Sequence, residues 1–194
     1  MDHPLHLEFL AAEVDVGRLP MTRAEVAFIG RSNVGKSSLL NAIADNQLLA
    51  PVSKNPGRTQ ALGCFALERT GATLVDCPGY GYARAAKSTR ERWLPMVESY
   101  LLEREQLQMA LLLVDGEIGP TATDLAMLEW LRTKEVPHAV VATKHDKVKP
   151  SQRNNRQREL AADCLLPAAD VLWVSATERF GIAQLRRRIR GWLA

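Results

Sequence analysis

Gly-Arg-Ser-Asn-Val-Gly-Lys-Ser, at residues 30–37, directly follows the apolar run 26–29 and precedes a helical pattern at 38–43. A buried strand, a loop bounded by two glycines and a helix start are the context in which a P-loop occurs. In a P-loop, the backbone N–H groups and the helix N-terminus surround a phosphate chain. Lys36 would reach the β- and γ-phosphates, and the Ser37 hydroxyl would ligate Mg²⁺. The loop therefore predicts binding of a nucleoside triphosphate, and a chance Gly/Lys/Ser turn is the alternative.

Strand-like and helical segments alternate along the rest of the chain, which is typical of βαβ units. This predicts an α/β fold of the P-loop NTPase class, a small-G-protein-like, mostly parallel sheet with helices on both faces. Strands are predicted at 6–13, 25–29, 61–67, 71–75, 109–114, 138–142 and 171–174, and helices at 36–45, 89–105, 121–134, 152–163 and 181–193. We expect one domain over residues 1–194, with an N-terminal extension at about 1–23 and the core at about 24–194.

The composition is that of an ordinary globular protein, since 46% of the 194 residues are hydrophobic and 24% are charged. No apolar run approaches the roughly 20 residues that a membrane-spanning helix needs. The first residues lack the basic and apolar regions of a signal peptide. Cys64, Cys77 and Cys164 have no CxxC or metal-type spacing, so we expect reduced thiols. These features predict a cytoplasmic protein without a membrane partner.

Charge is distributed unevenly along the chain. Residues 1–30 carry two Arg and five acidic residues, whereas residues 144–190 carry eleven Lys or Arg and five acidic residues. A basic C-terminal third favours a polyanionic partner, of which RNA is the obvious one. The alternative is that these residues only solvate helix faces.

Asp-Cys-Pro-Gly, at residues 76–79, follows the apolar strand 72–75. A carboxylate at the C-terminal end of a strand beside a P-loop is placed to hold Mg²⁺. The backbone N–H of Gly79 could then meet the γ-phosphate, because no Cβ blocks the approach. Taken alone, the tetrapeptide is equally typical of a plain turn, but its distance from Gly30 fits a helix, a loop and two strands.

Thr-Lys-His-Asp, at residues 143–146, closes the apolar strand 138–142. A carboxylate at Asp146 can accept hydrogen bonds from N1–H and the 2-amino group of guanine, whereas adenine has neither donor. The stem of Lys144 can lie along the base, and the Ala176 N–H in the turn Ser175-Ala176-Thr177 could serve the guanine O6. An exposed strand end is the alternative for this motif.

Two irregular stretches, 46–60 and 77–88, are rich in Pro or Gly and are predicted to switch between GTP and GDP states. Thr59 is the best candidate to bring a hydroxyl and a backbone N–H to Mg²⁺ and the γ-phosphate, after the turn Pro56-Gly57-Arg58. Ser53 and Thr70 are weaker rivals.

The motifs together predict a GTP-binding domain with Mg²⁺, GTP or GDP and a possible K⁺ as ligands. The predicted catalytic residues are Lys36, Thr59 and Gly79, and the predicted Mg²⁺ ligands are Ser37, Thr59 and Asp76. The predicted nucleotide-binding residues are Gly30, Arg31, Ser32, Asn33, Val34, Gly35, Lys36, Ser37, Ser38, Gly57, Arg58, Thr59, Gln60, Ala61, Asp76, Cys77, Pro78, Gly79, Thr143, Lys144, His145, Asp146, Ser175, Ala176 and Thr177.

At these motifs the chain resembles the EngB (YihA/YsxC) family of bacterial GTPases, from about residue 6 to the C-terminus. The resemblance rests on residues 30–41, on Pro-Gly-Arg-Thr-Gln at 56–60, on Asp-Cys-Pro-Gly-Tyr-Gly-Tyr-Ala at 76–83 and on 143–146. It implies a role in assembly of the large ribosomal subunit, with the subunit, its precursors or rRNA as partner, and a need for the protein in cell division and septation. We expect a monomer.

Three positions depart from Ras-like GTPases. Tyr80 stands where a Gln usually orients the attacking water, so we expect slow intrinsic hydrolysis. Asn33 either holds K⁺ beside the phosphates or only stabilises its turn. Thr143 replaces the common Asn, which could weaken a contact to the base or to the P-loop. The rival functions are a P-loop small-molecule kinase and a non-ribosomal regulatory GTPase.

Overall fold

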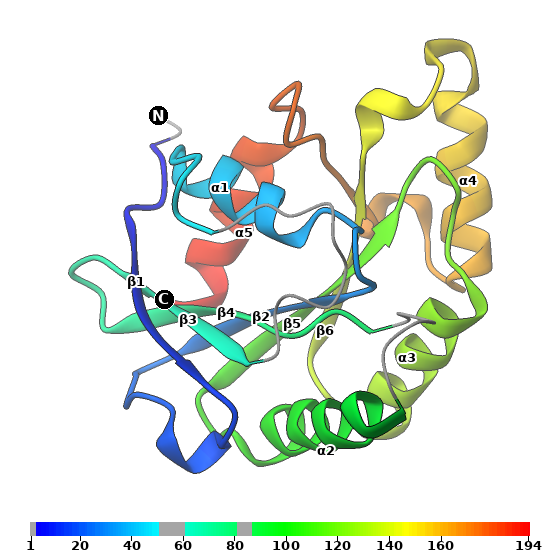
Figure 1. Cartoon of the computed structure of the whole chain (residues 1–194). Coiled ribbons are helices and arrows are strands. Elements are labelled where there is room, and N and C mark those ends of the chain that lie inside the picture. The colour runs from blue at the N-terminus through cyan, green and yellow to red at the C-terminus, as the bar shows by residue number, and fades with distance from the viewer. Residues whose placement is uncertain (1–2, 51–60, 81–86) are drawn as a thin grey trace.

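The computed structural model describes residues 3–50, 61–80 and 87–194. Within these ranges, seven strands form one sheet in the order β1-β3-β4-β2-β5-β6-β7 (Figure 1). The strands are β1 (Leu7–Glu13), β2 (Glu25–Gly30), β3 (Leu62–Leu67), β4 (Ala72–Asp76), β5 (Leu107–Asp115), β6 (His138–Thr143) and β7 (Leu172–Trp173). Strands β4, β2, β5, β6 and β7 run parallel, whereas β3 is antiparallel to its neighbours β1 and β4.

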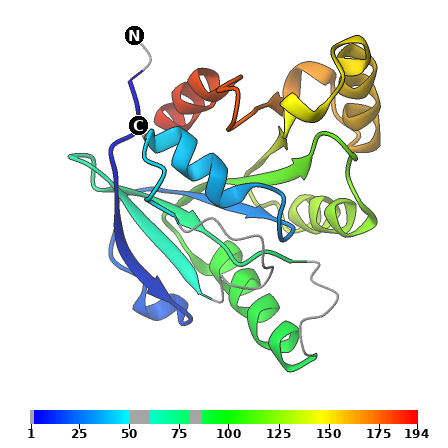
Figure 2. The same ribbon diagram turned by 45° about the horizontal axis from the view of Figure 1, so that its top comes forward.

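Helices cover both faces of this sheet. They are α1 (Lys36–Ala44), α2 (Lys87–Glu103), α3 (Ala122–Thr133), α4 (Arg153–Asp163) and α5 (Ile182–Trp192), with short 3₁₀ turns η1 (Val16–Arg18), η2 (His145–Lys147), η3 (Pro150–Gln152) and η4 (Ala168–Asp170). Figure 2 shows α1 and α5 together above the sheet and α2 below it. The α/β class and the doubly covered, mostly parallel sheet are therefore confirmed.

The central strand β5 explains why two cores form. Leu111 and Leu113 pack with α1 and α5, whereas Ala110, Leu112 and Val114 pack with α2, α3 and α4. Successive side chains of a strand point to opposite faces. A parallel strand covered by helices on both faces must therefore be apolar at every position, as residues 109–114 are.

Helix α5 carries an apolar stripe. Ile182, Leu185 and Ile189 are buried, and Trp192 packs against the same core. Arg186 of this helix does not lie in solvent. It is buried, and its guanidinium donates to the carbonyls of Ile43 at 2.8 Å and Ala42 at 3.0 Å. These carbonyls end α1, where the last turn of a helix leaves acceptors without intrahelical partners.

The N-terminal residues join the same sheet. Strand β1 pairs with β3 at the sheet edge, with a register shift between Phe9 and Ala11, and Leu5 and Leu7 are buried with α1 and α5. Each predicted strand and helix is found within two residues of its predicted bounds. Among the residues described, no helix is long and apolar enough to cross a membrane.

Candidate nucleotide-binding site

The predicted motifs gather at one edge of the sheet, where the parallel strands end. Strand β2 ends at Gly30, β4 at Asp76, β5 at Asp115 and β6 at Thr143. Asp115 pairs with Thr143, so β5 and β6 end at the same level. Strand β2 ends two residues earlier, where Gly30 pairs with Leu113, and β4 ends two residues before that, opposite Phe28. Ligands of open α/β sheets bind at this carboxyl edge.

The P-loop connects β2 to α1. Gly35 precedes the helix with φ of 105°, a left-handed conformation that a Cβ would strain. Lys36 is the first residue of α1, and its Nζ folds back over the loop to the carbonyls of Gly30 at 3.3 Å and Arg31 at 3.4 Å. Burial lowers the pKa of Lys36, and the carboxylate of Asp76 opposes this shift. A buried ammonium inside a phosphate-sized loop is a strong anion ligand.

Asp76 fits a divalent cation. It ends β4 with an exposed fraction of 5%, and its Oδ1 has no hydrogen-bond partner among the described residues. Burial raises the pKa of Asp76 to about 6, and Lys36 offsets part of that rise. Such an oxygen, close to Lys36 of the P-loop, matches the preference of Mg²⁺ for one or two carboxylates and phosphate oxygens.

Residues 77–80 extend β4 along the P-loop. The N–H of Cys77 donates to the Phe28 carbonyl at 3.0 Å, and the N–H of Ser32 donates to the Tyr80 carbonyl at 2.9 Å. The hydroxyl of Ser32 donates to the Gly79 carbonyl at 3.2 Å. A Cβ at Gly79 would lie 2.9 Å from the nitrogen of Ser32 and 3.0 Å from Nζ of Lys36. Only glycine allows this close approach to the P-loop.

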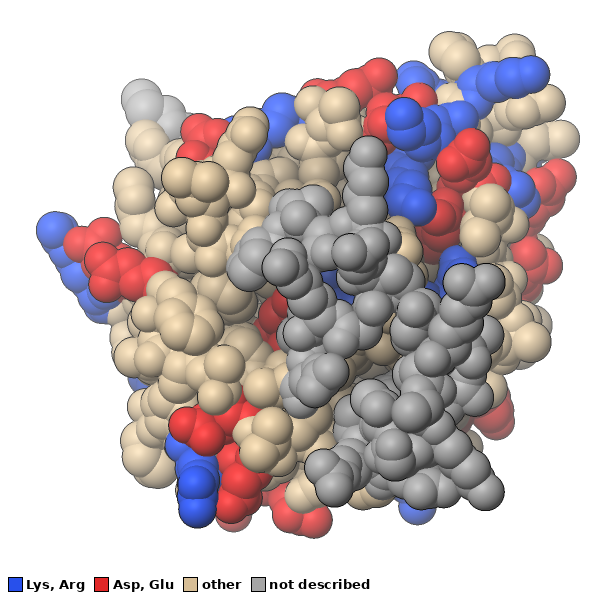
Figure 3. Space-filling model, in the orientation of Figure 1, with Lys and Arg blue, Asp and Glu red and all other residues tan. Residues whose placement is uncertain are grey.

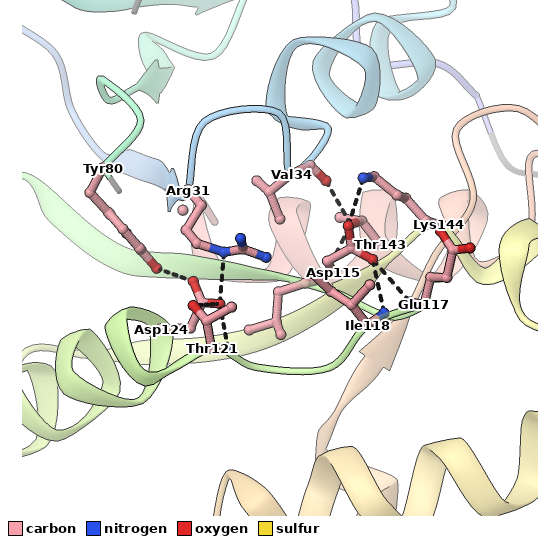
Figure 4. A network of polar contacts seen from close by, with 12 residues as sticks. Arg31, Val34, Tyr80, Asp115, Glu117, Ile118, Thr121, Asp124, Thr143 and Lys144 are labelled. Atoms are coloured by element: carbon pink, nitrogen blue, oxygen red, sulfur yellow. Dashed lines mark hydrogen bonds and ion pairs between the residues drawn. The ribbon is translucent and has the colours of Figure 1, made fainter. Parts of the chain in front are cut away.

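Tyr80 and Arg31 both point toward Asp124, at the start of α3 (Figure 4). The Tyr80 hydroxyl donates to Oδ1 at 3.0 Å, and Nε of Arg31 donates to Oδ2 at 3.0 Å. Oδ2 also accepts from the Thr121 N–H at 2.9 Å and the Thr121 hydroxyl at 2.8 Å. Burial, and then the Asp124 charge, raises the pKa of the Tyr80 hydroxyl. The buried Asp124 carboxylate thereby joins the P-loop, residue 80 and α3.

The loop after β6 is fastened to the P-loop and to β5. The Thr143 hydroxyl donates to the Val34 carbonyl at 2.7 Å and to the Val114 carbonyl at 3.2 Å. Lys144 pairs with Asp115 at 2.6 Å, and Asp115 also accepts from the N–H groups of Glu117 and Ile118 (Figure 4). A contact from Thr143 to the P-loop is therefore present, although threonine replaces the common asparagine.

Asp146 is held from the loop after β7. Its Oδ1 accepts from the Ser175 hydroxyl at 2.7 Å, and the side chain is 11% exposed. Ala176 and Thr177 of that loop line a cavity of about 590 Å³ together with Ser38, the residue after the P-loop motif. The volume lies within the range of small-ligand sites. The cavity lies between α1 and the loop after β7, since its other lining residues are Asn41, Ala42, Asp45, Gln47 and Arg179.

Several predicted residues cannot be placed. Gly57, Arg58, Thr59, Gln60 and the rival Ser53 lie outside the described residues, whereas Ala61 directly precedes β3. The alternative prediction that Thr70 serves Mg²⁺ and the γ-phosphate is wrong. It lies in the β3–β4 turn, where its hydroxyl donates to the Leu67 carbonyl at 2.8 Å. Leu67 pairs with Ala72, and Asp76 pairs with Gly63, so this turn is at the opposite end of the strands from the site.

Many basic residues of the C-terminal third contact other groups of the chain. Figure 3 shows Lys and Arg interspersed with Asp and Glu around the α4 side of this face. Seven of the eleven basic residues make internal contacts, namely Lys144, Lys147, Arg153, Arg156, Arg179, Arg186 and Arg190. Lys149, Arg158, Arg187 and Arg188 are exposed. Backbone carbonyls and carboxylates of the chain itself therefore use much of this charge.

Two acidic residues of the site were missed from the sequence. Asp124 completes a capping box with Thr121, and the Thr-x-x-Asp spacing is a signal that could have located it as a helix-capping carboxylate. Asp115 had a weaker signal, an acid at the end of an apolar strand. Neither pattern indicates the partners from distant loops.

A P-loop, a buried carboxylate beside it and a Thr-Lys-x-Asp loop at one sheet edge are the parts of a G domain. The class of protein that fold and site define is therefore the P-loop GTP-binding proteins. Residues 25–144 match the family described as "50S ribosome-binding GTPase".

Comparison with individual proteins narrows this class. The chain is 49% identical over 140 residues to the "Probable GTP-binding protein EngB" of Thermotoga maritima, covering 72% of this chain and 71% of that protein. A protein of the same name from Levilactobacillus brevis is 39% identical over 178 residues, covering 91% and 90%. A crystal structure of "a probable GTP-binding protein engB" shares the fold, with a TM-score of 0.71, 24% identity and coverage of 88% and 98%. The chain belongs to the EngB family of GTP-binding proteins.

Proposed function

We propose that this chain is a slow GTPase that acts as a nucleotide-dependent switch in assembly of the large ribosomal subunit. The observation that carries the nucleotide choice is the Asp146 carboxylate, held by Ser175 at the same sheet edge as the P-loop. Such a carboxylate accepts two guanine donors, and facing adenine it would lose both partners, which is costly for a buried charge. We further propose that residues 1–194 form one G domain and that the protein is a monomer.

Each part of GTP would be bound by a different set of residues. Lys36 and the P-loop N–H groups bind the β- and γ-phosphates. Ser37, Asp76 and Thr59 hold Mg²⁺, which when bound neutralises charge on the phosphates. The N–H of Gly79 meets the γ-phosphate, next to Ser32 and Lys36. Asp146, Lys144 and Ala176 surround the base.

We expect slow GTP hydrolysis because the Tyr80 side chain is buried and hydrogen-bonded. Its hydroxyl donates to Asp124 and the side chain is 3% exposed. A phenol committed to a carboxylate does not orient an attacking water as the glutamine of other GTPases does. Acceleration by a partner or by a monovalent cation is therefore part of the proposal.

GTP turnover is expected to be about tenfold faster in KCl than in NaCl at equal ionic strength, since K⁺ held by Asn33 would add positive charge beside the phosphates. Asn33 has φ of 64° and is exposed, a conformation that asparagine tolerates by itself. Asn33→Gly keeps this backbone and removes the amide, so it is the matched variant. Steady-state phosphate release measures the turnover of the wild-type protein and of Asn33→Gly in each salt. Equal rates in the two salts would leave Asn33 with a turn-stabilising role only.

The ribosomal partner is supported by the family description, which names binding to the 50S ribosome. A phosphate-rich partner needs exposed cations, and two pairs offer them on opposite faces of the sheet. Lys149 and Arg158 lie before and on α4, and Arg187 and Arg188 lie on α5. Binding should weaken steeply with salt, because each neutralised phosphate releases counterions.

Nucleotide-dependent cosedimentation with large subunits or their precursors tests this partner. We expect the wild-type protein to bind the subunits in the presence of a GTP analogue. Of two double variants, the one altered on the face that docks should bind the subunits about tenfold or more weakly. Lys149→Glu/Arg158→Glu and Arg187→Glu/Arg188→Glu change the net charge equally, so each controls for the other. GTP affinity should stay constant in both. Wild-type protein that binds GTP but no subunits would favour a non-ribosomal regulator, and tight ATP binding would favour a kinase. We also propose that cells need the protein for septation, and depletion of the protein from growing cells should then block septum formation.

A further inference from the structure

His145 and Phe180 form a stacked pair behind the base-reading loops. Their ring centroids are 3.9 Å apart and the rings are 7° from parallel. The ring centroid of Trp173 lies 6.0 Å from that of His145, and the two rings are 75° from parallel. His145 is 4% exposed, whereas Phe180 is 45% exposed and covers it. The contact joins residue 145, next to Asp146, to the end of the loop after β7.

Each ring is also tied to its loop through the backbone. The N–H of His145 donates to the Val174 carbonyl at 3.1 Å, and the N–H of Ser175 donates to the Phe180 carbonyl at 2.9 Å. The Ser175 hydroxyl accepts from the Glu178 N–H at 2.9 Å and donates to Asp146. Hydrogen bonds within residues 175–180 therefore hold this loop together. Its Phe180 side chain packs against His145 of loop 143–146.

The imidazole stacks in its neutral form at neutral pH. Burial lowers the pKa of His145, and Arg153 on α4 lowers it further, whereas Glu178 and Asp146 oppose the shift. A neutral aromatic pair of this geometry contributes beyond the apolar area that it buries. A neutral imidazole also forms no ion pair with Asp146, whose side chain accepts from the Ser175 hydroxyl and lies 3.8 Å from Nζ of Lys147.

We propose that His145 and Phe180 are positioning residues that hold the Asp146 carboxylate for the guanine base and so sharpen the preference for guanine. This inference rests on the proposed function of Asp146. Neither ring would touch the base; the pair acts through the relative position of the loops 143–146 and 175–180. Without it, the Ser175–Asp146 hydrogen bond and the His145–Val174 backbone bond would be left to align the carboxylate.

Calorimetric titration of the full chain with GDP and IDP tests the proposal, because inosine lacks the 2-amino donor. Phe180→Ala is expected to weaken GDP binding by about tenfold and IDP binding much less, since GDP depends on both contacts to Asp146. His145→Ala should weaken GDP and IDP binding as Phe180→Ala does. His145→Phe keeps a ring stack and should retain the wild-type GDP affinity. Phe9→Ala removes another exposed phenylalanine, on β1, and should change neither affinity.

An unchanged GDP-to-IDP affinity ratio in folded Phe180→Ala would overturn the proposal, even if both affinities fell, because a general loosening of the domain would weaken both ligands equally. The half-exposed Phe180 keeps the test available if His145→Ala does not fold. A wild-type protein that binds GDP and IDP equally would instead contradict the assignment of Asp146, and with it the inference. Wild-type preference together with an unaffected Phe180→Ala ratio would contradict the inference alone.

Discussion

Lys36→Ala is expected to abolish measurable GTP turnover and to weaken GTP binding by about tenfold to a hundredfold. Each charge-assisted contact of the ammonium to phosphate contributes about 1.5–3 kcal/mol. In the described structure the Lys36 ammonium donates to the carbonyls of Gly30 and Arg31 within the P-loop, so the substitution acts on this loop. Removing a buried charge whose pKa burial has lowered should also leave the fold intact.

The measurements for Lys36→Ala are GTP titration, phosphate release and near-UV circular dichroism. Lys134→Ala is the matched control, because this lysine is exposed at the end of α3. A folded Lys36→Ala protein with wild-type affinity and turnover would refute the P-loop assignment.

Asp146→Asn is expected to move the preference of the protein from GTP toward xanthosine triphosphate. The amide can donate to the 2-oxo group of xanthine but cannot accept from both guanine donors. Losing these contacts should weaken GTP binding by about a hundredfold. The Ser175 hydroxyl can still donate to the amide oxygen, so the 2.7 Å contact that holds the side chain survives the substitution.

Competition of GTP and xanthosine triphosphate for the protein measures this exchange. Asp163→Asn changes an exposed carboxylate at the end of α4 and should leave both affinities unaltered. If Asp146→Asn keeps the wild-type preference for GTP, the base is read elsewhere, and the role proposed for the loop 143–146 is wrong.

The elements were predictable because their signals are local. The glycine spacing of the P-loop and the apolar runs of β2 and β5 each reflect contacts of a residue with its near neighbours or with one face of the sheet. In α5, the stripe of Ile182, Leu185 and Ile189 follows from the 3.6-residue period alone. The same period does not indicate that Arg186 is buried, because periodicity does not reveal where another helix ends.

The partners of the charged site residues were not predictable in this way. Tyr80 and Asp124 are 44 residues apart, and Lys144 and Asp115 are 29 apart. Each pair meets because the order of the sheet places β5 between β2 and β6. Sequence position indicated that Tyr80 replaces a glutamine, but its burial against Asp124 depends on where α3 begins.

The amino-acid sequence by itself determined the α/β class, the P-loop and the order of the nucleotide-binding motifs, because strand and helix periods and glycine-dependent turns are set within short stretches of chain. Only the tertiary structure decided which charges are used internally and which remain exposed. It alone also brought Asp124 to Tyr80 and Arg31, Asp115 to Lys144, and Phe180 to His145. The physical reason is that a hydrogen bond or a ring stack requires atoms within a few ångströms, and the packing of the whole sheet and its helices determines which distant residues come that close.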